Sequence, residues 1–374
     1  MTVLAGACVV TPEGVLDRGR VRIRGDRIAE VGAGPPEEPE DVVDLGGHWL
    51  VPGFVDVHCH GGGGAAFDGA DPEQVATAVR THRAHGTTTL LASLVSAPVD
   101  ALADRVAALR GLVEDGLLAG VHLEGPFLSA ARCGAHDPAV LRPPEPDVVA
   151  RLLRAGRGAV RMVTLAPELA HATTAVRLLT EHGAIAALGH TDATFDQVAP
   201  AVDAGATVAT HLFNGMRPLH HREPGAVAAL LDDERITVEL IADLVHVHPA
   251  VLGLAARHAG PERIALVTDA ISATGAGDGT YRLGELEVSV TGGVPVLADG
   301  ALAGSTLTAD AGFRNLVRGC GLTVPDAVAA SAARPAELLG LADRGAIRPG
   351  TAADLVVLDE DLQVRQVIKD GQFC

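Results

Sequence analysis

The sequence predicts an α/β protein, a (β/α)8 barrel of the TIM type with a small discontinuous β-sandwich domain. After residue 52, apolar strand-like segments alternate with Ala-, Leu- and Arg-rich segments of helical period, eight times over. At both ends of the chain, short β-branched segments are separated by turns instead. A doubly wound open sheet is the alternative, but no GxGxxG motif follows the first barrel segment.

The small domain is expected to combine the two ends of the chain. Residues 1–50 hold VLAGACVV, RVRIRGDRIAEVG and VVDLGGHWLVPG, which are strand-like and separated by turn signals. Residues 346–374 hold PGTAADLVVLDEDLQVRQVIKDG, which is typical of two further strands. We therefore expect these two segments to assemble into one lobe.

The barrel is expected over residues 51–345. Its strand candidates are nearly continuous apolar runs, which indicates strands buried on both faces of a parallel sheet. They lie at 54–58, 87–93, 118–125, 160–168, 184–191, 206–214, 236–243 and 263–270. Residues 280–304 have the pattern of a β insertion after the eighth strand, and we expect this insertion to join the small lobe.

Composition and charge exclude several classes of protein. The 374 residues are 48% hydrophobic, so the chain is not intrinsically disordered and buries a sizeable core. A net charge of −18 disfavours nucleic acids and anionic membranes as partners. The sequence shows neither an apolar run of membrane-spanning length nor a secretory signal, and its five cysteines form no CxxC pair. We therefore expect a cytoplasmic protein.

Side chains that bind metal ions stand where the strand candidates end. They are His58, His60, Glu124, His190 and His211, with Asp269 after the eighth strand. The carboxyl ends of barrel strands form one face, so these side chains are expected to converge. His58 and His60 alternate along one strand and can face the same ion. Imidazole with carboxylate is a ligand set for zinc, iron or manganese, and the pattern predicts a metal centre.

Longer motifs around these residues resemble a known family. PGFVDVHCHG, HLEGPF, GHTDA, THLFNGMRPL, LVTDA, LAGSTLTAD and PGTAADLVVLD are similar to segments of the amidohydrolase superfamily, and within it of the N-acetylglucosamine-6-phosphate deacetylases. The resemblance covers nearly the whole chain. Many binuclear amidohydrolases bridge their ions with a carboxylated lysine after strand four, but the single lysine of this chain is Lys369. The resemblance to the deacetylases implies that Glu124 is the bridging anion instead.

The resemblance also implies roles for the metal ligands. Glu124, His190 and His211 would hold the principal divalent ion, and His58 with His60 a second ion that shares Glu124. Zinc or iron is expected, with one or two ions per chain. Amide hydrolysis at neutral pH needs a water whose pKa a metal lowers to ~7. It also needs a carboxylate that moves the proton to the leaving amine, and Asp269 is expected to be this general base and acid.

Substrate contacts are implied for five residues. They are His136, Asn214, Gly215, Arg222 and His246. His246 would contact the sugar and polarise the scissile carbonyl, and His136 would also contact the substrate. Asn214, Gly215 and Arg222 would bind the phosphate, for which the planar guanidinium of arginine is suited.

The family is usually a homodimer in which a loop of the partner also reaches the phosphate. His221 and Arg217 are both open for that role in this chain.

The expected reaction is hydrolysis of the acetamide of N-acetyl-D-glucosamine 6-phosphate to D-glucosamine 6-phosphate and acetate. Such a reaction belongs to amino-sugar catabolism or cell-wall recycling. The alternatives are another metal amidohydrolase, such as an N-acetylgalactosamine-6-phosphate deacetylase or a dipeptidase, and a non-catalytic scaffold of the same fold. A scaffold would be expected to lack ligands, whereas all five ligands and Asp269 are present.

Overall fold

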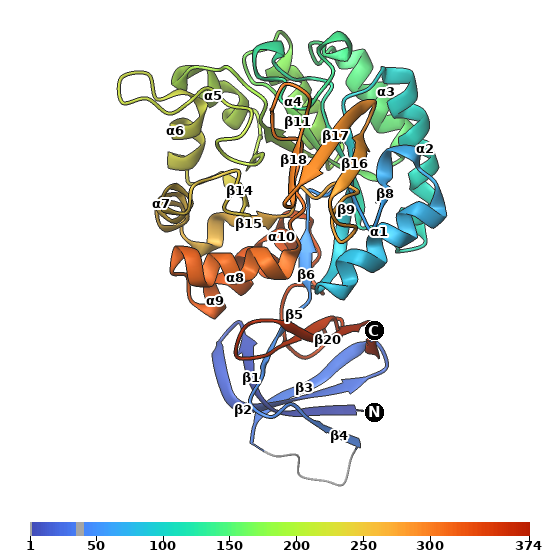
Figure 1. Cartoon of the computed structure of the whole chain (residues 1–374), viewed down its shortest axis with the longest axis vertical. Helices are drawn as coiled ribbons and strands as arrows, with labels where there is room; N and C mark the ends of the chain where they lie inside the picture. Colours follow the sequence, from blue (N-terminus) through green and yellow to red (C-terminus); the bar gives the residue numbers. More distant parts are fainter. Residues whose placement is uncertain (1, 35–40) are drawn as a thin grey trace.

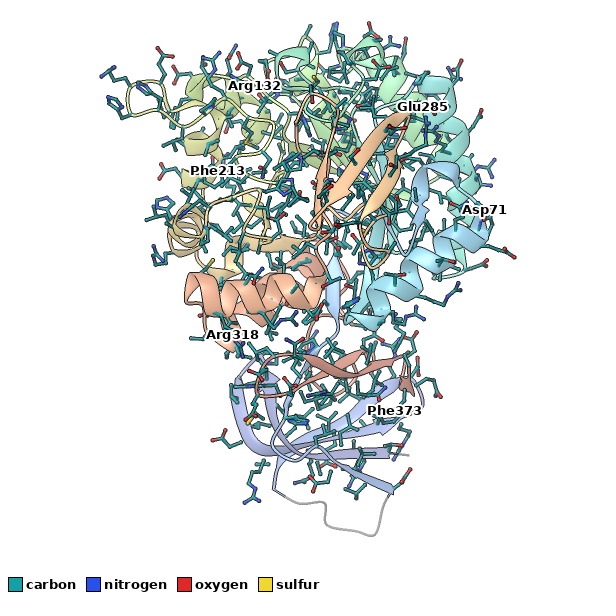
Figure 2. All side chains as sticks on the ribbon, viewed as in Figure 1. Asp71, Arg132, Phe213, Glu285, Arg318 and Phe373 are labelled. Carbon is teal, nitrogen blue, oxygen red and sulfur yellow. The ribbon has the colours of Figure 1, made fainter. Side chains whose placement is uncertain are left out.

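The structure is a computed structural model that describes residues 2–34 and 41–374. Met1 and residues 35–40 of the expected first lobe segment lie outside the described residues. A barrel surrounded by helices stands above a smaller sheet that contains both chain ends (Figure 1). Side chains fill both parts, and Arg132 lies at the end of the barrel far from the small sheet (Figure 2).

The barrel is a parallel sheet of eight strands, in the order β15-β14-β13-β12-β11-β10-β9-β6. Its strands are β6 (Phe54–Asp56), β9 (Thr87–Val95), β10 (Gly120–Glu124), β11 (Val160–Leu165), β12 (Ile185–Leu188), β13 (Val208–Ala209), β14 (Thr237–Ile241) and β15 (Ile264–Val267). Each strand lies on one of the expected segments, within a few residues at its ends. The expected (β/α)8 barrel is therefore confirmed.

A helix follows each strand and covers the outside of the sheet (Figure 1). The helices are α1 (Pro72–Ala84), α2 (Val99–Glu114), α3 (Pro146–Gly156), α4 (Ala172–Glu181), α5 (Phe195–Asp203), α6 (Gly225–Asp232), α7 (Pro249–Ala259) and α8 (Ala309–Cys320). Helix α1 shows how the sequence starts them: Asp71 caps it by accepting hydrogen bonds from two backbone N–H groups, and Pro72 follows. None of the described helices has the length and apolar character needed to cross a lipid bilayer.

Shorter elements connect the barrel to its surroundings. They are β7 (Gly61–Gly62), β8 (Ala65–Ala66), α9 (Val324–Val328), α10 (Arg334–Leu338) and the single-turn helices η1 (Phe67–Gly69), η2 (Ala130–Arg132), η3 (Pro138–Val140), η4 (Pro261–Arg263) and η5 (Ala329–Ala333).

The barrel closes where the first and eighth strand segments end. The backbone N–H of Asp269 donates to the carbonyl of His58 at 2.8 Å, and that of His60 donates to the carbonyl of Ala270 at 2.8 Å. The Thr268 hydroxyl donates to Asp56 at 2.6 Å, next to this closure. Backbone pairing thus places both histidines of the HxH pair beside Asp269.

The small sheet runs in the order β21-β20-β19-β5-β1-β2-β3, with β4 paired to β1. Its strands are β1 (Thr2–Thr11), β2 (Gly14–Arg24), β3 (Arg27–Ala33), β4 (Asp41–Asp44), β5 (Trp49–Pro52), β19 (Leu355–Leu358), β20 (Val364–Lys369) and β21 (Gln372–Phe373). β5 pairs antiparallel with β19, so both chain ends share one sheet. A separate apolar cluster that includes Leu4, Leu50 and Leu355 is its core.

The insertion after the eighth strand does not join that lobe, so this expectation is wrong. Strands β16 (Gly279–Leu283), β17 (Leu286–Thr291) and β18 (Val294–Val296) form a three-stranded sheet of their own. Its apolar side chains pack on Val95 and Ile271 of the barrel. β-Branched alternation predicts strands but not the sheet that they join, because the partner surface lies elsewhere in the chain. The three strands stand over the barrel instead (Figure 1).

Candidate metal centre and active site

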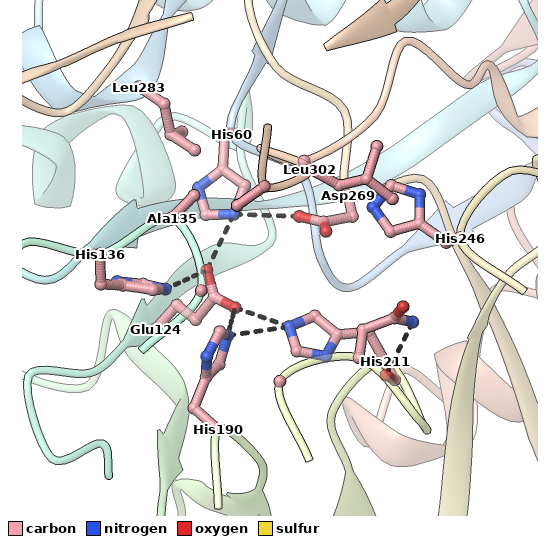
Figure 3. Close-up of a pocket in the computed structure, with 15 residues that line it drawn as sticks. His60, Glu124, Ala135, His136, His190, His211, His246, Asp269, Leu283 and Leu302 are labelled. Atoms are coloured by element: carbon pink, nitrogen blue, oxygen red, sulfur yellow. Dashed lines mark hydrogen bonds and ion pairs between the residues drawn. The ribbon is translucent and has the colours of Figure 1, made fainter. Parts of the chain in front are cut away.

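A cavity of about 250 Å³ opens at the carboxyl ends of the barrel strands. Nine of the eleven expected site residues line it, and they are His60, Glu124, His136, His190, His211, Asn214, Gly215, His246 and Asp269 (Figure 3). His58 is fully buried and contacts His60. Arg222 does not line the cavity in the single chain.

Glu124, His190 and His211 form the first group of candidate metal ligands. Oε1 of Glu124 lies 3.0 Å from Nε2 of His190 and 2.9 Å from Nε2 of His211. The two Nε2 atoms are 3.1 Å apart. Nδ1 of His190 donates to the carbonyl of Arg132 at 2.9 Å, so Nε2 is the ring atom that faces Glu124.

His58, His60 and Asp269 form the second group. The Nε2 atoms of His58 and His60 are 3.2 Å apart. Oδ1 of Asp269 lies 3.3 Å from His60 Nε2 and 3.5 Å from His58 Nε2. Oε2 of Glu124 lies 3.2 Å from His60 Nε2, so the two oxygens of this carboxylate face different groups. Two cation positions that share Glu124 fit this arrangement.

The electrostatics of the site favour positive charge. Burial lowers the pKa of His60, but hydrogen bonds to Asp269 and Glu124 outweigh burial and raise it to about 9. Burial raises the pKa of Asp269, but His58 and His60 outweigh burial and lower it to about 2. A divalent cation among these atoms would meet the same need for positive charge as a proton. The nitrogen and carboxylate donors are those that zinc and iron accept.

Three residues that face the cavity adopt a left-handed backbone conformation. The φ angles are +46° at His190, +25° at His211 and +50° at Asp269. Residues with a Cβ rarely adopt this conformation, and it is concentrated at functional sites. All three follow the end of a barrel strand. The strained backbone aims their side chains at Glu124 and at the HxH pair.

His136 is held as a hydrogen-bond donor. Its Nδ1 accepts from the backbone N–H of Ser96 at 3.2 Å. Burial lowers the pKa of His136 to about 4 despite the nearby Glu124, so the ring is neutral at pH 7. A neutral ring whose Nδ1 accepts carries its hydrogen on Nε2, which lies 3.4 Å from Oε2 of Glu124. His136 therefore stands close enough to be a ligand, but in the protonation state of a donor.

His246 is oriented by Asp243. Its Nδ1 lies 2.6 Å from Oδ2 of Asp243, whose other oxygen accepts from the backbone N–H groups of Val245 and His246. Burial lowers the pKa of His246, but the hydrogen bond to Asp243 outweighs burial and raises it. His246 lies on the Asp269 side of the cavity (Figure 3).

The expected phosphate-binding residues divide into two sets. Asn214 and Gly215 line the cavity, and Nδ2 of Asn214 donates to the carbonyl of His211 at 3.1 Å. Arg222 is exposed on the loop before α6, where its guanidinium lies 2.8 Å from the ring of His221. This loop extends away from the barrel (Figure 1).

Sequence reasoning missed several residues of the site. Leu283 and Leu302 cover the cavity from the insertion, which was expected elsewhere. Asp243 orients His246, and Glu239 on β14 contacts His58. Glu239 did have a signal, because it is the only acid inside the otherwise apolar run ITVELI. A buried acid in a barrel strand calls for a partner of opposite charge or a donor.

Comparison with known proteins agrees with this geometry. The amidohydrolase family matches residues 49–374. The chain belongs to the amidohydrolase family.

Among the relatives of this amidohydrolase, the N-acetylglucosamine-6-phosphate deacetylase of Bos taurus is 38% identical, over 98% of this chain and 94% of the relative. The N-acetylgalactosamine-6-phosphate deacetylase of Escherichia coli O157:H7 is also 38% identical, over 100% of this chain and 99% of the relative.

A solved structure extends the likeness to the whole fold. It is that of an aspartate-to-alanine mutant of N-acetyl-D-glucosamine-6-phosphate deacetylase from Mycobacterium smegmatis, in complex with N-acetyl-D-glucosamine-6-phosphate. It is 48% identical with a TM-score of 0.97, over 100% of this chain and 98% of that chain. The resemblance to these deacetylases is therefore confirmed.

Lys369, the one lysine of this amidohydrolase, lies outside the candidate metal centre. Lys369 ends β20 in the small sheet, where its ammonium group lies 2.9 Å from Asp354. The barrel has no lysine in its sequence. Glu124 is instead the anion that stands between the two histidine groups.

Proposed function

We propose that this amidohydrolase hydrolyses the acetamide of N-acetyl-D-glucosamine 6-phosphate to D-glucosamine 6-phosphate and acetate. One observation carries the proposal: Glu124 faces a histidine pair with each of its oxygens, and Asp269 stands beside the second pair. The relatives named above are deacetylases of N-acetylated amino-sugar phosphates, which supports the substrate class.

The ligands fit one or two divalent ions, and we favour zinc or iron. Glu124, His190 and His211 would hold one ion, and His58 with His60 would hold a second that shares Glu124. When bound, such an ion supplies an activated water at neutral pH and positive charge for the carbonyl oxygen.

Asp269 is the proton carrier of the proposed reaction. Its pKa of about 2 keeps the carboxylate ionised at neutral pH, so it can accept a proton from the attacking water. The water oxygen bonds to the acetyl carbon, and the bond from that carbon to nitrogen breaks. Asp269 then gives this proton to the leaving amine, and the products are acetate and glucosamine 6-phosphate.

Two histidines and an apolar wall would orient the substrate. His246 offers a hydrogen-bond donor to the sugar and the scissile carbonyl, and its bond to Asp243 fixes the ring. His136 offers its Nε2–H to the substrate from the other side of the cavity. Leu283 and Leu302 line the cavity with the apolar surface that an acetyl methyl group needs.

The phosphate requires a cation, and no arginine or lysine among the described residues lines the cavity. Asn214 and Gly215 can donate to phosphate oxygens there, but Arg222 is exposed on a loop that points outward. We therefore place the protein in a homodimer in which the partner subunit's Arg222 reaches the phosphate.

We place the enzyme in the cytoplasm, in amino-sugar catabolism or cell-wall recycling. A phosphorylated sugar as substrate and five free cysteines are consistent with that compartment.

Acetate release tests the proposal. The substrates are N-acetylglucosamine 6-phosphate, its galactosamine epimer and unphosphorylated N-acetylglucosamine, each with metal-loaded and chelator-treated protein. We expect metal-dependent release from the first substrate and little from the unphosphorylated sugar. Preference for the epimer would favour the activity named for the Escherichia coli relative. No release from any sugar by metal-loaded protein would contradict the proposal.

A further inference from the structure

Glu239 is a buried acid on the wall of the barrel that the proposed reaction does not use. It lies in the middle of β14 and has no exposed surface. Its strand neighbours Val238 and Leu240 point to the other face, where they pack with the helices. Burying a carboxylate without partners is costly, so its contacts define its role.

One oxygen of Glu239 accepts two hydrogen bonds. Oε2 lies 3.1 Å from Nδ1 of His58 and 3.1 Å from the backbone nitrogen of His211. The backbone N–H can only donate, so Oε2 is an acceptor. Oε1 has no partner among the described residues, so a proton on Oε1 of a neutral Glu239 would have no acceptor. The geometry is therefore that of a carboxylate to which His58 donates through Nδ1.

This contact fixes the orientation of His58. With hydrogen on Nδ1, Nε2 is the ring atom of His58 that is left to hold an ion, and it faces His60 Nε2 at 3.2 Å and Asp269 Oδ1 at 3.5 Å. His60 differs, because its Nδ1 has no partner among the described residues. Within this histidine pair, His58 is the ring with a carboxylate behind it.

The same oxygen also holds the backbone that carries a ligand of the other group. It accepts from the N–H of His211, whose φ of +25° is unfavourable for a residue with a side chain. The next residue, Leu212, donates its N–H to the carbonyl of Glu239 at 2.9 Å. Glu239 thus contacts one residue of each group of candidate ligands, His58 through its ring and His211 through its backbone.

We propose that Glu239 is a positioning residue for a second divalent ion, because it aims Nε2 of His58 at the His60 and Asp269 side of Glu124. The chain then binds two ions, and the second depends on Glu239. This inference rests on the proposed metal-dependent function. A carboxylate behind a ligating histidine fixes the ring and raises its basicity, and its loss commonly costs 10–100-fold in metal affinity.

A Co²⁺ titration of metal-free protein, followed by visible absorbance and calorimetry, tests this inference. We expect two equivalents in the wild type. Glu239→Leu keeps bulk but removes both the acceptor and the charge, so the second equivalent should bind about 10–100-fold more weakly. Glu239→Gln keeps an acceptor oxygen without the charge, and its second equivalent should bind with intermediate affinity. Leu240→Met, on the same strand but the opposite face, should bind both equivalents as the wild type does.

Two results would overturn the inference. One is a wild type that binds a single equivalent, and the other is Glu239→Leu protein that binds the second equivalent as tightly as the wild type. Circular dichroism checks the fold of each variant. If the leucine variant does not fold, wild-type affinity for the second ion in Glu239→Gln overturns it instead. Acetate release by the wild type is measured separately, so failure of the proposed function is distinguished from failure of this inference.

Discussion

The backbone N–H of Ser96 donates a hydrogen bond to Nδ1 of His136 across 3.2 Å. This contact separates two roles that proximity alone would allow. His136 lies among side chains that could hold an ion with Glu124 and His190. A ring that accepts through Nδ1 and is neutral has its hydrogen on Nε2, so it donates into the cavity and does not ligate.

Replacing His136 should therefore reduce turnover and leave the metal content unchanged. For His136→Asn we expect kcat/KM for N-acetylglucosamine 6-phosphate to fall about 10²–10³-fold, the usual cost of removing one donor that stabilises developing charge. Steady-state kinetics and metal analysis of the same preparation check this. Loss of an ion equivalent in the variant would show that His136 is a ligand.

Asp269→Asn removes the proton carrier but keeps the shape of the side chain. Because an amide cannot accept the proton from water, we expect kcat to fall about 10²–10⁴-fold. Substrate should still bind, which calorimetry of the inactive variant measures directly. A kcat within tenfold of the wild type would assign proton transfer to another group.

Arg222→Ala should raise KM for the phosphorylated sugar by tenfold or more and change kcat less, since the guanidinium binds a group remote from the reacting bond. Arg217→Ala is the comparison on the same loop. The side chain of Arg217 forms an ion pair with Asp192 at 2.7 Å.

Mixed dimers test whether Arg222 acts across the interface. Arg222→Ala and Asp269→Asn proteins are each impaired, but in a mixed dimer one site has its own Asp269 together with the partner subunit's Arg222. We expect mixing and re-association to restore a fraction of wild-type kcat/KM. No restoration in dimers that have exchanged subunits would mean that Arg222 acts within its own chain or not at all.

The stability of the fold should fall in acid partly because of His82. Burial lowers the pKa of His82 to about 4, and its hydrogen bond to the carbonyl of Gly61 offsets this only in part. Unfolded histidine titrates near 6.5. Between these values the unfolded chain binds a proton that the folded chain excludes. Stability therefore declines as pH falls from about 6.5 to about 4, by about 3 kcal/mol from this residue.

His82→Gln isolates that contribution, because an amide can donate to Gly61 but does not titrate. The free energy of unfolding is measured in urea between pH 7 and pH 4.5 for both proteins. The variant should lose less stability over this range than the wild type. Parallel curves would show that the pKa of His82 is the same in the folded and the unfolded chain.

Local features of the sequence determined most of the fold and which candidate ligands converge. Continuous apolar runs predict strands buried on both sides, and the end of each strand is readable from the polar residues that follow it. Parallel barrel strands all end at one face, so histidines and acids at those positions converge whatever the loops do. For this reason the convergence of Glu124, His190 and His211 was predictable without coordinates.

Only the tertiary structure decided which residues support the candidate ligands and which segment covers the cavity. His58 and Glu239 are 181 residues apart, and they meet because the barrel brings its first and seventh strands together in space. The insertion covers the cavity because its apolar side chains fit Val95 and Ile271, a surface that does not exist until the barrel forms. Local periodicity specifies what each segment becomes, whereas contacts between distant segments depend on packing that no single segment encodes.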